Sequence, residues 1–300
     1  MKGNIILAIL LIFSSGRSQT RYVTTIHPFQ EIMKSVVKNR GEVYRILPPG
    51  ASPHTYELRP SDIRKVETAA ALILGGKNLD EWAFKFQHPN RIELLNLIPA
   101  DYLLHLEFES QDEHQHAKHE KVVASQHHHH RGGIDPHFWT DPLAVKALLP
   151  PLVEKLCLID KEGAETYKKN TAKFSTYLDS LFTVINKKLK PIQGKAVMLS
   201  HPFFRYFFNR FGIELVGIVE INPGKEPTPK DIKEMIGLVK DNKVRAIFTH
   251  PQLPDRAAQL VAEATGAKVY QLDPIGGVPG RQSYDELLLY NVQVLLEALR

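Results

Sequence analysis

The stretch "KAVMLSHPFFRYFFNRFGIELVGIV", residues 195–219, decides the fold class of this chain. It predicts a strand over 195–200, a helix over 202–212 that ends at a glycine, and a second strand over 213–219. Two strands joined through a helix pair in parallel, because the crossover returns the chain to the starting edge of the sheet. The stretch therefore predicts an α/β protein whose parallel sheet is covered by helices.

The same alternation of strands and helices extends along the chain on both sides of this stretch. The predicted architecture is two lobes, each a four-stranded, mostly parallel sheet flanked by helices. The side chain of Ser61 is expected to cap the first turn of one helix. Further strands are predicted at 22–26, 42–47, 71–76, 91–97, 244–250 and 267–273, and further helices after 22–26, from about 61, and over 78–86, 228–242, 254–266 and 283–300.

One long helix is predicted to join the two lobes. From about residue 160 to 189, apolar residues recur at spacings of three and four, which form one face of a helix. Pro150 and Pro151 are expected to break or kink the segment before it. We assign the N-terminal lobe to 20–155, the connecting helix to 156–190 and the C-terminal lobe to 191–300, with limited hinge motion. The apolar face comprises Phe174, Tyr177, Leu178, Leu181, Phe182 and Ile185.

The N-terminus has the layout of a secretory signal peptide, which we assign to residues 1–19. Lys2 precedes an apolar run, Ile5 to Phe13, and small and polar residues follow. The run is about half the roughly twenty residues that a membrane-spanning helix needs, so we expect export without stable membrane insertion. Cys157 is the only cysteine, so neither an intrachain disulfide, a thiolate-rich metal site nor a lipid anchor at the cleavage point is expected.

The overall composition is that of an ordinary globular protein. Apolar residues make up 43% of the chain and charged residues 24%, and the formal net charge is +5. Lysine and arginine are scattered among acidic residues, whereas nucleic-acid binding usually requires a concentrated basic face. We therefore expect no nucleic-acid partner.

Four residues occupy comparable positions in the predicted fold. His54 follows the second strand, His137 lies in "DPHFWTDP" after the fourth, His201 directly follows the strand at 195–200, and Asp273 ends the last strand. Ligands of open parallel sheets bind at the carboxyl ends of the strands. If the lobes face each other across a cleft, three imidazoles and one carboxylate converge there.

This set of side chains suits a metal ion. Imidazole nitrogen and carboxylate oxygen suit zinc, which prefers four tetrahedral ligands at roughly 2.0–2.2 Å. Copper, nickel and iron also accept imidazole, whereas manganese prefers more oxygen ligands. Because imidazole must be neutral to bind, the affinity should fall as the pH drops through about 6.5.

A polar, low-complexity segment separates His137 from the fourth strand. We expect residues 107–133 to form a mobile loop, since they contain few groups to bury. Histidines on such a loop lose conformational freedom when they hold an ion. Our hypothesis is that the loop gathers zinc weakly or modulates loading, and deletion of residues 110–131 tests it. The loop histidines are His114, His116, His119, His127, His128, His129 and His130.

Several stretches resemble one known family in sequence and order. They are "PPGASPHTYELRPSDI" (48–63), "DPHFWTDP" (135–142), "SHPFFRYFFNRFGIE" (200–214), "IFTHPQLPDRAAQLVAEATGAKV" (247–269) and "LDPIGG" (272–277). Together they resemble the zinc/manganese solute-binding proteins of ABC importers (cluster A-I), and within that family the periplasmic zinc-uptake receptors. The resemblance covers nearly the whole chain after the signal peptide.

The resemblance implies a periplasmic, monomeric receptor that binds Zn²⁺ and delivers it to an ABC permease and its ATPase. It implies that His54, His137 and His201 are metal ligands and that Asp273 is the fourth. Relatives selective for manganese usually carry a carboxylate at the position of His201, which favours zinc here. One departure is His250, where many relatives have glutamate. Two interpretations of His250 stay open: a surface residue or one that surrounds the ligands, which we favour, and an auxiliary ligand near the cleft. We expect His27 to lie near the cleft without being a ligand.

Three other functions remain open from the sequence. A zinc hydrolase of the cell envelope would use three histidines and a base such as Glu57 or Asp141, but Asp273 would then close the position that water needs, and the chain has no "HExxH". A manganese receptor would share the fold. A zinc-buffering or adhesive envelope protein would bind several ions without a permease. We expect a receptor and not an enzyme.

Overall fold

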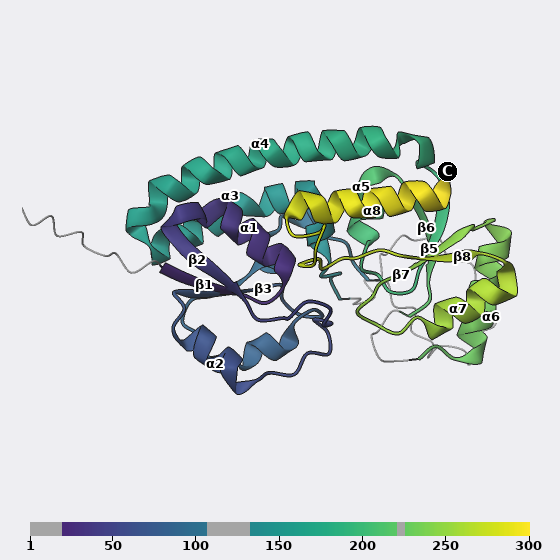
Figure 1. The fold of residues 1–300 in the computed structure, drawn as a ribbon, viewed down its shortest axis with the longest axis horizontal. Helices are drawn as coiled ribbons and strands as arrows, with labels where there is room; N and C mark the ends of the chain where they lie inside the picture. The colour runs from purple at the N-terminus through teal and green to yellow at the C-terminus, as the bar shows by residue number, and fades with distance from the viewer. Residues whose placement is uncertain (1–19, 107–132, 221–225) are drawn as a thin grey trace, which may run out of the picture.

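The computed structural model describes residues 20–106, 133–220 and 226–300. Two four-stranded sheets form the centres of two lobes, and all strand pairs within the described residues are parallel (Figure 1). The predicted fold class is therefore confirmed. The N-terminal sheet has the order β2-β1-β3-β4, with β1 Thr20–Thr24, β2 Gly41–Arg45, β3 Ala71–Leu74 and β4 Arg91–Glu93. The C-terminal sheet has the order β6-β5-β7-β8, with β5 Ala196–Leu199, β6 Glu214–Ile218, β7 Ala246–Thr249 and β8 Lys268–Gln271.

The fourth strand is shorter than the sequence predicts. β4 ends at Glu93, and Leu94–Leu97 form a 3₁₀-helical turn, so the prediction of a strand to residue 97 was wrong. Leu94 and Leu95 are nevertheless buried, and the Leu95 N–H donates to the carbonyl of Gly75. A short apolar run marks burial but does not distinguish a strand from a buried turn.

The helices of the N-terminal lobe are α1 His27–Val37 and α2 Pro60–Glu67, which lie on opposite faces of the sheet (Figure 1). Ser61 lies inside α2, so the prediction that it caps the helix was wrong. Pro60 begins the helix, and the carboxylate of Asp62 accepts a hydrogen bond from the Arg59 N–H. Proline suits this first position because it has no N–H to satisfy. Residues Glu81–Lys85 form the short predicted helix as a 3₁₀ turn.

The segment before the long helix is not broken by its two prolines. α3 runs from Pro142 to Ile159 and contains both Pro150 and Pro151, so the expected break does not occur. Leu149 and Leu152, on either side of the pair, are almost completely buried. Their packing stabilises the helix across the two missing N–H donors, which shows how tertiary contacts override a local preference.

The predicted long helix is α4, Ala164–Leu189. It lies across both lobes and packs on α3 and α1 as well as on α8, Tyr284–Leu299 (Figure 1). Of the predicted apolar face, Phe174, Leu178, Leu181 and Ile185 are buried, whereas Tyr177 is exposed. Because one helix packs on elements of both lobes, limited hinge motion stays our expectation. The exact lobe boundaries at 155 and 190 remain our proposal.

The remaining helices cover the C-terminal sheet. They are α5 Arg205–Phe211, α6 Pro229–Asp241 and α7 Arg256–Thr265. A small core lies between the sheet and the pair α6 and α7, while a larger core is continuous through both lobes. In the part of the chain that the structure describes, the helices are too short or too polar to cross a bilayer. The predicted signal peptide at 1–19 lies outside the described residues.

Candidate metal centre

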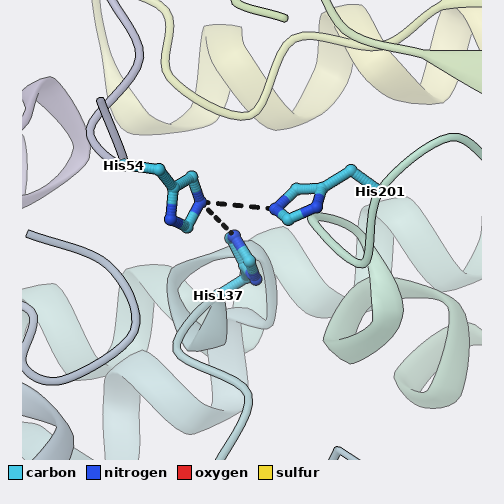
Figure 2. Close-up of side chains that lie close together, drawn as sticks. All are labelled: His54, His137 and His201. Atoms are coloured by element: carbon cyan, nitrogen blue, oxygen red, sulfur yellow. Dashed lines mark hydrogen bonds between the residues drawn. The ribbon is translucent and has the colours of Figure 1, made fainter. Parts of the chain in front are cut away.

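Three of the predicted ligands meet between the lobes. His54 follows β2, His201 follows β5, and His137 precedes the 3₁₀ turn Phe138–Thr140. The Nε2 atom of His54 is 3.3 Å from Nε2 of His137 and 3.3 Å from Nε2 of His201, and the three rings point toward one another (Figure 2). All three ligand atoms lie within 4.8 Å of one another. Residues from three distant parts of the chain thus form one cluster of ring nitrogens.

The spacing of these nitrogens matches a small tetrahedral ion. Ligand atoms bound to zinc at about 2.05 Å lie roughly 3.3 Å apart along each edge of the tetrahedron. The two Nε2–Nε2 distances of 3.3 Å have this length. Three imidazoles therefore stand close to the arrangement that one zinc ion requires.

In two of the rings, the Nδ1 atom lies beside a hydrogen-bond acceptor. Nδ1 of His137 is 2.7 Å from a carboxylate oxygen of the buried Asp135, and Nδ1 of His201 is 3.3 Å from the Glu220 carbonyl. Carboxylate and carbonyl oxygens only accept, so Nδ1 carries the hydrogen in both rings. Their Nε2 atoms then present lone pairs toward His54. A neutral His54 ring offers at most one N–H to these two lone pairs, whereas a cation between the rings would accept both, and this protonation pattern of His137 and His201 is that of metal-bound histidines.

Burial keeps the rings of His54 and His201 neutral. It lowers the pKa of His54 to about 3, mainly by desolvation and secondarily by the neighbouring His137 and His250. Desolvation, followed by the effects of His137 and His54, also holds the pKa of His201 well below its usual range. A positive charge is unfavourable among neighbouring imidazoles, so these two residues stay unprotonated and able to bind metal at neutral pH.

The enclosed space is small. It is lined by His54, His137, His201 and His250 together with Trp139 and Phe203, and its volume is ≈ 10 Å³. About one water-sized sphere fits a volume of this size, so the site accepts a single ion but not an organic molecule beside it. Trp139 and Pro274 both line this space. The Trp139 indole N–H, from the N-terminal lobe, donates to the carbonyl of Pro274, in the C-terminal lobe, at 2.7 Å.

Asp273 is close to the site but does not join the cluster of ligand atoms. It is buried and lies two residues after the end of β8. Its Oδ1 accepts hydrogen bonds from the backbone N–H groups of Ile275 and Gly276 and from the Gln252 side chain, each at 3.0 Å. Its Oδ2 lies 3.2 Å from an Arg281 nitrogen. The carboxylate is thus already held by four donors, and its role as fourth ligand stays a prediction.

His27 and His250 differ in their relation to the cluster. His27, at the start of α1, is buried so close to Gly276 and Gly277 that a side chain at either glycine would meet its ring, but it does not line the space between the clustered rings. His250 follows β7 and does line that space, with its ring centroid 5.7 Å from that of His201. The predicted loop histidines, from His114 to His130, lie outside the described residues.

Sequence reasoning missed the residues that hold the ligands. Asp135 bonds both Nδ1 and the backbone N–H of His137, and Arg205 lies 3.3 Å from its other oxygen. The signal was present, because an aspartate two residues before the candidate ligand in "DPHFW" can bond back to it. Arg205 also donates to the His105 carbonyl, beside the backbone bridge between His105 and Ile134.

A comparison with protein families shows to which family the chain belongs. The profile of the family described as "Zinc-uptake complex component A periplasmic" (ZnuA) matches residues 23–298. The chain belongs to the ZnuA family. It is thus a solute-binding receptor of the zinc/manganese type that serves ABC importers, as the sequence motifs predicted. Receptors of this family are periplasmic or otherwise extracytoplasmic and work with a permease and an ATPase.

Individual relatives of this ZnuA-family chain agree with that assignment. The high-affinity zinc uptake system protein ZnuA of Brucella abortus is 28% identical over 278 residues, which cover 85% of this chain and 83% of that protein. The laminin-binding protein Lmb of Streptococcus agalactiae, described as a bifunctional protein with adhesin and metal-transporting activity, has a TM-score of 0.73 at 26% identity and covers 94% of this chain and 100% of that one. FpvC of Pseudomonas aeruginosa, solved with Mn²⁺, shares the fold alone, with a TM-score of 0.75 at 23% identity over 94% of this chain and 98% of that one.

Proposed function

We propose that this chain captures Zn²⁺ outside the cytoplasm and delivers it to the permease of an ABC importer. The observation that carries the proposal is the cluster of three Nε2 atoms with two 3.3 Å edges between the lobes. His54, His137 and His201 supply three ligands. The fourth position is open to the Asp273 carboxylate, which the sequence predicts, and to the neighbouring imidazole of His250.

Zinc rather than manganese suits this site. Manganese prefers oxygen ligands, whereas three neutral imidazoles with little water favour zinc, copper or nickel. Zinc uptake is also the activity in the name of the Brucella relative. The Mn²⁺ complex of FpvC supports only the common fold, so the choice of ion is a question for direct measurement.

Transport, rather than hydrolysis, suits the surroundings of the cluster. A catalytic zinc needs an open position for water, a base and room for a substrate. The space of ≈ 10 Å³ between the rings offers little such room. Of the two candidate bases, Asp141 caps α3 and pairs with Arg210, and Glu57 is exposed. We therefore propose a receptor and not an enzyme.

Calorimetry of metal-stripped protein with zinc and with manganese tests the proposal. One tight zinc site per chain and a much weaker response to manganese are expected. His201→Ala should weaken zinc binding by at least about 100-fold, because it removes a ligand from a closed site. His88→Ala is the matched control, since the ring of His88 bonds the Ala69 carbonyl away from the cluster. Equal affinity for the two metals would overturn the choice of zinc, and no tight site would overturn the receptor function.

A further inference from the structure

His250 has an unsatisfied nitrogen beside the three clustered histidines. It is 4% exposed, and its ring stands 5.7 Å from that of His201 and 4.4 Å from that of Phe203, measured between ring centroids. Its Nδ1 is 3.0 Å from Oε1 of Gln252. Its Nε2 is buried and has no hydrogen-bond partner. An unpaired buried polar atom destabilises a folded protein, so its presence here needs a reason.

The hydrogen bonds around Gln252 determine where the proton of His250 lies. The Gln252 amide nitrogen is 3.0 Å from Oδ1 of Asp273. A carboxylate accepts only, so the amide nitrogen must face Asp273 and the amide oxygen must face His250. That oxygen also accepts only, so Nδ1 of His250 carries the hydrogen. In the neutral ring, Nε2 therefore has a free lone pair.

His250 thus repeats the pattern of His137 and His201. In each ring, Nδ1 donates to an oxygen, of Asp135, Glu220 or Gln252 in turn, and Nε2 is left as the base. Outer hydrogen bonds of this kind orient metal-binding histidines and raise their basicity. The unpaired Nε2 belongs to a ring that lines the same small space as the other three.

The competing fourth ligand is less available. Both oxygens of Asp273 are engaged, Oδ1 by three hydrogen-bond donors and Oδ2 by Arg281. A metal ion would have to share this carboxylate with a guanidinium 3.2 Å away. Binding to His250 instead leaves those interactions intact and gives the unpaired nitrogen a partner.

We propose that His250 supplies the fourth ligand, so that the ion is held by four imidazole nitrogens. The inference rests on the proposed function, since it concerns the same ion. His250 lies outside the group of three whose ligand atoms are within 4.8 Å of one another, so its ring approaches them when the ion binds. A neutral, all-nitrogen ligand set discriminates against manganese more strongly than one with a carboxylate.

The X-ray absorption spectrum of the full chain loaded with one zinc per molecule tests this directly. The wild-type spectrum should show four nitrogen neighbours with the multiple-scattering pattern of four imidazoles. His250→Gln should lose one imidazole, and Asp273→Asn should keep all four. Three imidazoles and one carboxylate oxygen in the wild type would overturn the inference, and that measurement needs no variant to fold.

Affinities measured against a chromophoric chelator give a second test. His250→Gln should weaken zinc binding by at least about tenfold and narrow the difference between zinc and manganese. His27→Gln is the matched control, because His27 is also a buried histidine with two unpaired ring nitrogens but does not line the ion space. The control should bind zinc as the wild type does. Circular dichroism of each variant checks that it is folded.

The outcomes separate the two proposals. If the wild type binds zinc tightly, His201→Ala abolishes this and His250→Gln leaves affinity and selectivity unchanged, the four-imidazole site is wrong and the receptor function stands. If the wild type has no tight zinc site, both proposals fail together.

Discussion

At the scale of single residues, the site depends on the side chains that form hydrogen bonds with the proposed ligands. Asp135 is fully buried and bonds His137 through both the ring Nδ1 and the backbone N–H. It fixes the orientation of the ring and leaves Nε2 free for the ion. A carboxylate bonded to the outer ring nitrogen is the usual partner of a metal-binding histidine.

Asp135→Asn should therefore weaken zinc binding without removing a ligand. The amide keeps an acceptor for Nδ1 but loses the charge, and we expect an affinity loss of roughly 10-fold to 100-fold. Competition with a chelator measures it. Asp179→Asn is the control, because Asp179 is an exposed carboxylate of α4 that pairs with Lys146 of α3. Equal affinities of Asp135→Asn and the wild type would show that Asp135 does not tune the ligand.

The depressed imidazole pKa values predict how binding responds to acid. The pKa of His54 is lowered to about 3, and that of His201 lies well below its usual range, because both rings are desolvated. With a pKa of about 3, His54 stays neutral in the folded protein at pH 5.5, and the lowered pKa of His201 acts in the same direction, so we expect little proton release from these two rings when zinc binds. Calorimetry at pH 5.5 in buffers of different ionisation enthalpy should count fewer than two released protons. A count of two or more would mean that at least one of these rings is protonated.

The same shifts affect stability with a definite sign. Below about pH 6.5, an imidazole of the unfolded chain takes up a proton that His54 in the folded protein does not. The metal-free protein should therefore lose stability as the pH falls below about 6.5. From the sequence alone, zinc affinity is expected to fall near about pH 6.5. Because burial lowers the pKa values of His54 and His201, protonation of these two rings should weaken zinc binding only at lower pH.

At the scale of elements, the junction between α3 and α4 is held by one carboxylate. Asp160 accepts two hydrogen bonds from Arg40, at 2.6 and 2.7 Å, and one from the Tyr167 hydroxyl at 2.6 Å. The Arg40 guanidinium, the largest favourable influence, lowers the pKa of Asp160 to about 2. This ties the long helix to the segment between α1 and β2 of the N-terminal lobe.

Asp160→Asn should destabilise the protein in a pH-dependent way. The pKa of about 2 in the folded protein lies below the ordinary pKa of an aspartate, so the stabilisation is present above about pH 4 to 5 and is lost as the pH falls through 2. Urea unfolding should show a loss of about 1 kcal/mol at pH 7, since solvent screens a pair this close to the surface. The difference should shrink at pH 3. A loss that is the same at both pH values would assign the effect to packing.

At the scale of the whole molecule, the two lobes share one core. The larger cluster of buried side chains runs from the N-terminal sheet through α3, α4 and α8 into α5. The Trp139 indole and the Tyr284 hydroxyl add hydrogen bonds across the same boundary, to the carbonyls of Pro274 and Trp139. Because the lobes bury surface against common helices, we expect them to unfold together.

Leu178→Ala should test this coupling. Leu178 lies in the middle of α4 and is completely buried, so its truncation should cost about 2–5 kcal/mol. Calorimetry of the metal-free protein should show one transition that moves to lower temperature without splitting. Val184→Ala in the same helix is the control, because Val184 is 44% exposed and its loss should have little effect. Two separate transitions would show that the lobes are independent.

The sequence by itself determined the α/β class, the eight strands, the long connecting helix and the three histidines that meet. These follow from local patterns, since periodicity and chain order identify strands, and the carboxyl ends of parallel strands lie at one edge. Local patterns misjudged Ser61 and the end of β4, and of the expected break or kink at Pro150 and Pro151 the break does not occur, because burial and neighbouring side chains decide such details.

Only the tertiary structure decided how the ligand nitrogens are aimed and which of them lack partners. Asp135, Gln252 and Arg281 set the protonation and availability of His137, His250 and Asp273 through hydrogen bonds and a salt bridge. Some of these contacts join residues close in sequence, such as Asp135 and His137, but spacing alone does not show which ring nitrogen such a contact leaves free. A lone pair has a direction, and that direction depends on where the fold places each ring and its acceptor.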